Sequence, residues 1–443
     1  MKFSLHGLAA SLFLTTAALS AQAPLTPESQ LVFTPYHATG IYAVGERVGW
    51  TVTRPADDSC LHYTYTAKKN DLNVLKTGEL DLTAGTGTIE TASNAPAMIL
   101  VNIEQQCAPP IAASVPTPGA PAPKPKLTLL GAAVAPELLK PSEETPSDFE
   151  TFWASQLNKL KKIPINPVLT PAPLPAGSES AGIQMFTIKL DSVDSHVQGY
   201  LAKPAKPGKY PAMVVYQWAG VYKLNPDVSA HFAEEGWFTF NVDSHDMAPT
   251  DDAGAPKNYS TLHNDDPDKS YFLNMYLRDT RALDYIESSP DWDGKTIVLT
   301  GSSMGGMQSL ATAALNPTRV TAIAVRVPAG ADMNGGLHGR KTGYPNWPID
   351  DTNVVKTSPY FDPVNFAPRI KAATLVGMGF IDTTSPPAGV WTVYNLIPAP
   401  KAIVPLIDTA HDNVSPPEKY VPFETRKMAM FNQILAGQPI TLP

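Results

Sequence analysis

Lysine and arginine are scarce in this sequence, and they are not clustered. The 443 residues carry 33 Lys and Arg against 41 Asp and Glu, a net charge of −8, and no basic block interrupts this balance. A nucleic-acid-binding protein needs clustered basic side chains to displace counterions from phosphates. We therefore expect no nucleic-acid partner.

Long apolar runs and metal-binding motifs are also missing. A transmembrane helix needs about 20 consecutive apolar residues, and no such run occurs, so we expect no membrane span. The sequence has no H-E-x-x-H, no paired C-x-x-C and no Walker loop, which are signatures of zinc, redox and nucleotide sites. We expect neither a metal nor a cofactor.

The start of the chain has the features of an export signal. Lys2 gives a short positive start, residues 8–19 form an apolar run too short to cross a bilayer, and Ala21-Gln22-Ala23 is a small-x-small cleavage site. We expect residues 1–23 to be a signal peptide. The mature protein is then secreted or periplasmic.

Cysteine is nearly absent, with Cys60 and Cys107 as the whole complement. Outside the cytoplasm two cysteines in one small region can oxidise. We expect a disulfide between them, which would stabilise the fold by about 4 kcal/mol on the loop-length model. Two buried free thiols are the alternative.

Proline is abundant, with 45 residues, about twice the usual frequency of roughly 5%. Seven prolines fall in residues 108–126, which predicts an exposed, semi-rigid linker. Before it, residues 24–107 read as a small all-β, immunoglobulin-like sandwich domain. After it, residues 127–443 are predicted to form a catalytic domain that folds on its own. The strands expected in the first domain are 40–53, 60–67, 72–82, 85–91 and 97–105.

The second domain alternates strands with helices. Apolar strands separated by helices predict an α/β fold, with a mainly parallel sheet covered on both faces. Ligands bind such sheets beyond the carboxyl ends of the strands, so functional residues are expected in the loops that follow them. The expected strands are 185–190, 197–203, 210–218, 237–242, 296–300, 320–327, 372–378 and 401–407. The expected helices are one that Pro146 opens after a Thr145 cap and Pro164 ends, followed by 271–287, 304–315, 387–396 and 422–435.

A candidate nucleophile lies in one of these loops. Residues 301–306, Gly-Ser-Ser-Met-Gly-Gly, follow the strand 296–300 and open the helix 304–315. A G-x-S-x-G motif at a strand-to-helix turn is typical of a nucleophile elbow, which exposes the serine hydroxyl at a helix N-terminus. We expect Ser303 to be the nucleophile; a glycine-rich packing turn is the alternative.

A serine needs a base, and the base needs a carboxylate. His411 follows the last expected strand and is the predicted base, with His338 and His245 as the next candidates. Asp382 follows the strand 372–378 and is the predicted acid, with Asp332 as its competitor. The chain order Ser, Asp, His is that of an α/β-hydrolase.

An acyl-transfer site also needs N–H donors for the oxyanion. We expect the backbone N–H of Met304 and that of Ala219, or failing that Trp218, to serve. Three aromatic residues are predicted to face Ser303 and contact a sugar and its short acyl group: Trp218, Tyr344 and Trp347. Loop-to-core packing is the alternative for each ring.

From about residue 130 onward the chain resembles the acetyl xylan esterase and cephalosporin-C deacetylase family of α/β-hydrolases, carbohydrate esterase family seven. The matching stretches are 146–153, 297–308, 358–367, 382–387 and the loop of His411. The resemblance implies an α/β-hydrolase fold and deacetylation of sugar esters through Ser303, Asp382 and His411.

The sequence departs from the family pattern around the cleft. Met304 replaces a Gln, residues 244–246 (Ser-His-Asp) replace an Arg-Gly-Gln, Gln217-Trp218 replaces a His-Gly, and Asp412 replaces a Glu. We expect a secreted serine esterase that acts on acetylated carbohydrate or other small esters. A peptidase or longer-acyl esterase on the same fold and a non-catalytic glycan-binding protein are the alternatives. The sequence leaves the oligomeric state open.

Overall fold

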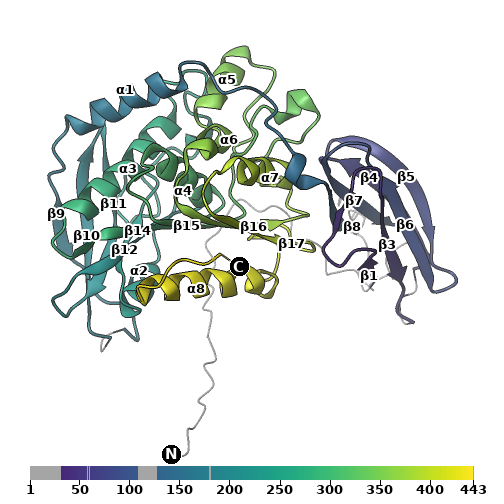
Figure 1. Ribbon diagram of the computed structural model, residues 1–443, viewed down its shortest axis with the longest axis horizontal. Helices are drawn as coiled ribbons and strands as arrows, with labels where there is room; N and C mark the ends of the chain where they lie inside the picture. The colour runs from purple at the N-terminus through teal and green to yellow at the C-terminus, as the bar shows by residue number, and fades with distance from the viewer. Residues whose placement is uncertain (1–30, 57, 59, 108–126, 179–180, 443) are drawn as a thin grey trace, which may run out of the picture.

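The computed structural model describes residues 31–56, 58, 60–107, 127–178 and 181–442. They form a small β domain beside a larger α/β domain, which lie side by side in Figure 1. The expected signal peptide, residues 1–23, and the proline-rich stretch, residues 108–126, lie outside the described residues.

The N-terminal domain consists of two β sheets over one core. One sheet has the order β1-β3-β6, and the other has the order β2-β8-β7-β4-β5. Val48, Trp50 and Ile89 of the first sheet pack with Tyr65 and Val101 of the second in a single buried cluster. The strands are β1 (Val32–Pro35), β2 (Ile41–Tyr42), β3 (Arg47–Thr53), β4 (His62–Lys69), β5 (Asn73–Asp81), β6 (Thr86–Ala92), β7 (Ala97–Gln105) and β8 (Leu127–Val134).

Strand β8 corrects the expected domain boundary. It pairs antiparallel with β7 along its whole length, from Leu127 opposite Glu104 to Val134 opposite Ala97. Residues 127–134 therefore belong to the N-terminal domain and do not begin the catalytic one. The proline-rich stretch 108–126 joins two neighbouring strands of one sheet, so it is not a linker between domains.

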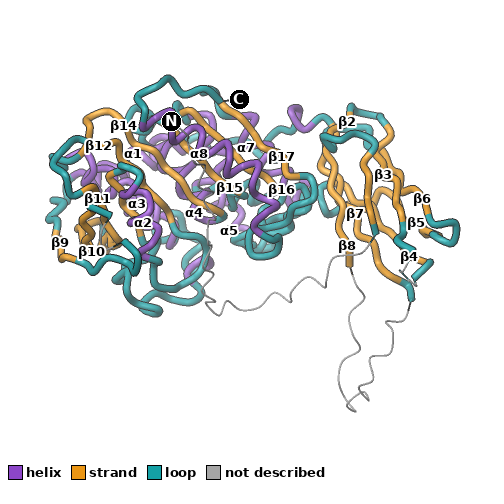
Figure 2. The backbone as a smooth tube through the Cα atoms, turned by 90° about the horizontal axis from the view of Figure 1, so that it is seen from below, coloured by secondary structure: helices purple, strands orange, loops and turns teal. Residues whose placement is uncertain are grey.

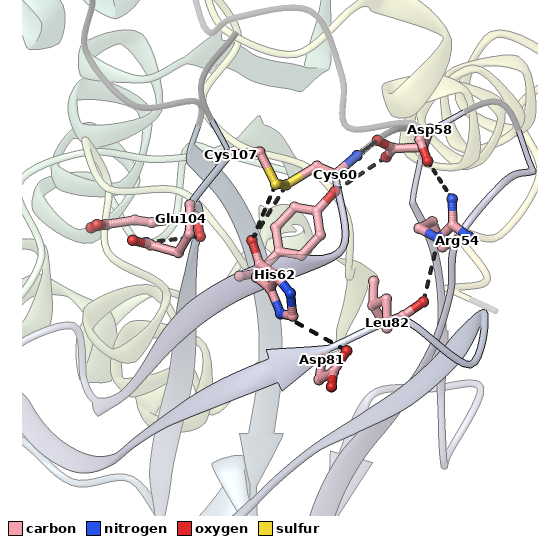
Figure 3. Close-up of a disulfide and its surroundings, with 10 residues drawn as sticks. Arg54, Asp58, Cys60, His62, Asp81, Leu82, Glu104 and Cys107 are labelled. Atoms are coloured by element: carbon pink, nitrogen blue, oxygen red, sulfur yellow. Dashed lines mark hydrogen bonds and ion pairs between the residues drawn. A yellow bond between two sulfur atoms is a disulfide. The ribbon is translucent and has the colours of Figure 1, made fainter.

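A disulfide joins Cys60 to Cys107, with their Cα atoms 5.5 Å apart. Figure 3 shows it beside the backbone carbonyl of His62, which is 3.3 Å from Cys60 Sγ. In the same region the Asp58 carboxylate accepts hydrogen bonds from the Cys60 N–H and, at 3.1 Å, from the Tyr63 hydroxyl. The bridge thus ties the segment before β4 to the end of β7.

The α/β domain is built on a nine-stranded sheet with the order β17-β16-β15-β14-β12-β13-β11-β10-β9. Strands β12 to β17 run parallel, and β9 to β11 add an antiparallel edge. The strands are β9 (Val168–Pro171), β10 (Ile183–Ser192), β11 (Ser195–Pro204), β12 (Tyr210–Tyr216), β13 (Phe238–Val242), β14 (Trp292–Ser302), β15 (Ala322–Arg326), β16 (Ala373–Gly379) and β17 (Lys401–Leu406).

Helices cover both faces of this sheet, as Figures 1 and 2 show. Helices α2 and α8 lie on one face, and α1, α3, α4, α6 and α7 lie on the other. The helices are α1 (Phe149–Lys161), α2 (Pro226–Glu234), α3 (Tyr271–Ser288), α4 (Met304–Leu315), α5 (Thr352–Thr357), α6 (Pro363–Phe366), α7 (Pro387–Leu396) and α8 (Val421–Leu435). None of the described helices is long and apolar enough to cross a membrane.

The expected elements of this domain are present, α4 and α7 with the expected ends and the others with shifted ends. This mixed α/β architecture fits an α/β-hydrolase fold. Helices α2, α5 and α6 and strand β9 were missed. Strand β9 is exposed throughout, so it carries no alternating apolar pattern that a sequence could reveal.

Candidate active site

Strand β14 gives way to helix α4 at a sharp turn that carries Ser303. Ser303 has φ 55° and ψ −120°, a conformation that costs a residue other than glycine about 1–3 kcal/mol. Two glycines allow the close approach: a Cβ on Gly301 would lie 2.5 Å from the Gly305 backbone, and one on Gly305 would lie 2.3 Å from the carbonyl oxygen of Tyr216. The turn presents the Ser303 hydroxyl at the start of α4, beside the end of β12.

The loops after β14, β16 and β17 bring Ser303, Asp382 and His411 together. The Ser303 Oγ lies 2.9 Å from His411 Nε2, and the His411 Nδ1 lies 2.8 Å from Asp382 Oδ2. All three side chains are buried. Because Asp382 Oδ2 accepts the Nδ1–H, the Nε2 of neutral His411 is left free to accept the proton of Ser303.

Both oxygens of the Asp382 carboxylate, in the turn after β16, accept hydrogen bonds. Its Oδ1 accepts the backbone N–H groups of Thr384 and Ser385, each at 2.8 Å, while its Oδ2 faces His411. The competing acid Asp332 lies elsewhere. Its carboxylate binds Ser142 and, at 2.6 Å, Arg340 Nη1.

Charge around His411 favours its protonated form. Burial acts to lower the pKa of His411, but the adjacent Asp382 carboxylate, with help from Asp412, outweighs burial and raises the pKa above its usual 6.5. An imidazolium that forms during reaction is therefore stabilised where it stands.

The other candidate bases do not reach Ser303. His338 Nε2 lies 3.3 Å from Glu143 on an exposed loop. His245 is buried, and its Nε2 donates to the carbonyl oxygen of Gly220 at 2.9 Å while its Nδ1 accepts from the Tyr271 hydroxyl at 2.8 Å. Burial lowers the pKa of His245 to about 4, so the ring is neutral near pH 7.

His245 is one of the side chains that hold the loop after β12, where the second oxyanion donor is expected. Another is Tyr259, whose hydroxyl oxygen accepts the Gly220 N–H at 2.9 Å. Both backbone groups of the residue after Ala219 are thus fixed by buried side chains. Nothing in the sequence indicated this role for Tyr259, because Tyr259 lies 39 residues from Gly220 in the chain and its neighbours form no recognisable motif.

Most of the α/β domain matches a known family. The model for the acetyl xylan esterase family, AXE1, matches residues 137–335 and 345–431. The chain belongs to the acetyl xylan esterase family. The match begins just after β8 ends, which agrees with a domain boundary near residue 135.

Individual relatives agree with this family. The chain is 36% identical over 282 residues to the acetyl esterase Axe7A of Xylanibacter ruminicola; the match covers 60% of this chain and 64% of that protein. The structure is similar to the acetyl xylan esterase of Paenibacillus sp. R4, with a TM-score of 0.58, 23% identity, and coverage of 68% and 98% of the two chains. It is also similar to acetyl xylan esterase 1 of Thermoanaerobacterium sp. JW/SL YS485, with a TM-score of 0.56, 20% identity, and coverage of 66% and 96%.

Two departures from the pattern of the acetyl xylan esterase family contact each other in the structure. The Gln217 Oε1 accepts the Ser244 N–H at 3.0 Å, and Gln308 of α4 contacts both, at 3.0 Å to the Gln217 carbonyl and 3.0 Å to the Ser244 hydroxyl. The two replaced stretches therefore form one buried hydrogen-bonded unit.

The three predicted aromatic contacts have different environments. Trp347 is only 5% exposed; it stacks on Phe272 and its Nε1 donates to the Ser260 carbonyl, which favours the alternative of loop-to-core packing. Tyr344 lies beside the elbow, with its hydroxyl 3.2 Å from Met304 Sδ. Trp218 is 53% exposed and stacks on Tyr222.

Among the described residues, no group of three or more His, Cys, Asp or Glu side chains is arranged to hold a metal ion.

Proposed function

We propose that this chain is a serine carboxylic-ester hydrolase that removes acetyl groups from carbohydrate, of the xylan type, or from other small esters. The observation that carries the proposal is the hydrogen-bonded series Asp382, His411 and Ser303 at a strained strand-to-helix turn. The membership of the acetyl xylan esterase family supports the acyl group. The named activity of the Xylanibacter relative supports it as well.

In the first half of the reaction, Ser303 Oγ attacks the acetyl carbonyl carbon while His411 Nε2 takes its proton. Asp382 stabilises the imidazolium across the 2.8 Å contact. The tetrahedral intermediate then collapses, the bond to the alcohol oxygen breaks, and His411 returns the proton to that oxygen. The products are a free sugar hydroxyl and an acetyl ester on Ser303.

In the second half, His411 Nε2 takes a proton from a water molecule, and the water oxygen attacks the carbonyl carbon of the acetyl-enzyme. The second tetrahedral intermediate collapses, the bond to Ser303 Oγ breaks, His411 returns the proton to Oγ, and acetate leaves. Both tetrahedral intermediates place negative charge on the former carbonyl oxygen. We assign its stabilisation to the backbone N–H groups of Met304 and Ala219. The support for Ala219 is that its loop is fixed at Gly220 by His245 and Tyr259.

The surroundings of Ser303 favour a short acyl group and a sugar leaving group. Tyr344 packs against Met304, immediately after the nucleophile, and limits the space beside it. Trp218, next to the proposed donor Ala219, offers an exposed aromatic face on which a sugar ring can stack.

We also propose that the protein is secreted or periplasmic, and that its N-terminal domain is an immunoglobulin-like β-sandwich. The disulfide between Cys60 and Cys107 supports an oxidising compartment. Two sheets packed over one core support the sandwich.

The test is hydrolysis by the purified chain of 4-nitrophenyl acetate, of 4-nitrophenyl octanoate and of acetylated xylan. We expect acetate release from xylan and a preference for acetyl over octanoyl well above tenfold, because overpacking costs about 1–3 kcal/mol. Ser303→Ala should lower kcat by more than about 10³-fold without unfolding the protein.

Other outcomes separate the alternatives. Equal rates on acetyl and octanoyl esters would favour a longer-acyl esterase. Cleavage of peptide substrates without cleavage of esters would favour a peptidase. Binding of xylan without turnover of any ester would favour a non-catalytic glycan-binding protein. Undiminished activity of Ser303→Ala would refute the assigned nucleophile.

A further inference from the structure

The turn that carries Asp382 packs directly on the N-terminal domain. Gly131 of β8 lies so close that a Cβ there would come within 2.6 Å of Phe380 Cβ and 3.0 Å of Ile381 Cγ2. Met98 of β7 and Ala133 of β8 are part of the buried core of the α/β domain, together with Phe380. Asp382 of this turn therefore contacts His411, while Phe380 and Ile381 just before it contact strand β8 of the N-terminal domain.

A small cavity marks the same junction. Its volume is about 10 Å³, and its walls include Asn70 and Met98 of the N-terminal domain together with Asp382 and Pro386. The candidate catalytic acid thus lies at the domain interface itself.

The turn between β4 and β5 makes a second connection, to the loop 335–347. Lys341 donates its backbone N–H to the Asn70 carbonyl at 3.0 Å, and its Nζ lies 2.7 Å from Asp71 Oδ2. The side-chain amide of Asn73 donates to the Gly339 carbonyl at 3.1 Å. We call these contacts of Asn70, Asp71 and Asn73 with the loop the interdomain clamp.

The loop 335–347 leads from the interdomain clamp to the active site. The Tyr344 N–H donates to the Thr384 carbonyl at 2.8 Å, and the Thr384 N–H in turn donates to Asp382 Oδ1. The same loop holds Tyr344 against Met304. A displacement of the loop would therefore reach both the acid and the residue that follows the nucleophile.

We propose that the N-terminal β domain is a positioning element of the active site: through the interdomain clamp it holds the loop 335–347 and the turn of Asp382 in the geometry that His411 requires. Asp71, Lys341 and Asn73 are then positioning residues. The inference rests on the proposed esterase function. Active sites are sensitive to such support, since a misplacement of 1 Å can cost about 10²-fold in rate.

The test uses the full chain with Asp71→Ala, Lys341→Met and Asn73→Ala. We expect kcat on 4-nitrophenyl acetate to fall about tenfold, with a smaller change in KM. The acidic limb of kcat/KM should move to lower pH, because a loosened Asp382 no longer raises the pKa of His411 as strongly. Asn73→Ala is included because it loosens the interdomain clamp without changing any charge.

Two controls accompany these variants. Lys76→Met removes the same charge as Lys341→Met from an exposed position on β5, and it should leave kcat and the pH profile unchanged. Lys341→Arg retains the ion pair and should retain most of the activity. Hydrogen exchange of residues 380–386 should be faster in the interdomain clamp variants than in the unmodified chain.

The outcomes are distinguishable. If the unmodified chain hydrolyses no ester, the proposed esterase function fails. If the unmodified chain is active and the interdomain clamp variants lose thermal stability but keep kcat, pH profile and exchange at 380–386, the contacts are only structural and the inference is overturned. If any of these variants does not fold, Asn73→Ser takes its place: it removes the side-chain amide that donates to the Gly339 carbonyl and is judged by kcat, pH profile and exchange at 380–386.

Discussion

The hydroxyl of Ser302 donates a hydrogen bond to the carboxylate of Asp412. Each residue is the immediate neighbour of a member of the candidate triad, so this bond joins the elbow to the loop of the base. Arg326 at the end of β15 reinforces it, with its guanidinium 3.1 Å from Asp412 and 2.7 Å from Glu424. The distance between Ser303 and His411 is thus maintained by the contact of their neighbours Ser302 and Asp412 as well as by their own hydrogen bond.

This relationship gives a pH prediction. The pKa of His411 is raised, and the base must be neutral to accept a proton, so kcat/KM should fall as the pH drops through a value above 6.5. Asp412→Asn removes one of the charges that raise it, and the acidic limb should therefore shift to lower pH. The measurement is kcat/KM between pH 4 and 9. Ser288→Ala, at the end of α3, serves as a control, and a limb shifted to higher pH by Asp412→Asn would contradict the electrostatic account.

A second prediction concerns Tyr259. Tyr259→Phe leaves the Gly220 N–H without its acceptor and should loosen the loop of Ala219. Loss of an oxyanion donor costs about 10²–10³-fold in kcat, so loss of its support should cost about tenfold with little change in KM. Tyr210→Phe removes a hydroxyl at the opposite end of β12 and should be neutral. Equal kcat for both variants would show that the loop needs no such support.

A third prediction separates sugar binding from chemistry. Trp218→Ala removes an exposed aromatic face, so it should raise KM for acetylated xylo-oligosaccharides several-fold, as expected for the loss of about 1 kcal/mol of ring contact. For 4-nitrophenyl acetate, which has no sugar, the change should be smaller. The comparison needs steady-state kinetics on both substrates. An equal loss on both would indicate damage to the oxyanion loop instead of a lost sugar contact.

The fourth prediction concerns truncation. A chain of residues 127–443 retains β8 without β7 and β2, and it exposes the apolar face that Phe380 shares with Met98. We expect low solubility, a lower Tm and weak esterase activity, in contrast to the independent folding expected from the sequence. Differential scanning calorimetry of this fragment and of the full chain is the measurement. A fragment with the full Tm and activity would show that the interface contributes nothing.

Local patterns predicted much of the fold, and contacts between distant segments explain what they missed. Helix α4 was predicted to the residue, because an apolar segment follows a glycine-rich turn, and Ser303 was recognisable for the same reason. Strand β8 was assigned to the wrong domain, because its partner β7 lies beyond the proline-rich stretch and strand pairing across such a gap leaves no local signal. For Trp347 the sequence left two roles open, because a large aromatic residue in a loop has the same local pattern whether it contacts substrate or, as here, stacks on Phe272.

The place of β8 also determines how this chain can be recombined. If a gene fusion were cut within the proline-rich stretch, β8 would be separated from β7. The N-terminal fragment would then lack one strand of its sheet, and the C-terminal fragment would begin with an unpaired strand. A cut between Ala135 and Pro136 transfers all eight strands as a unit. The side-chain amide of Asn395 in α7 donates to the carbonyl groups of Pro136 and Leu139. The new N-terminus of the catalytic domain would therefore stay bound to α7.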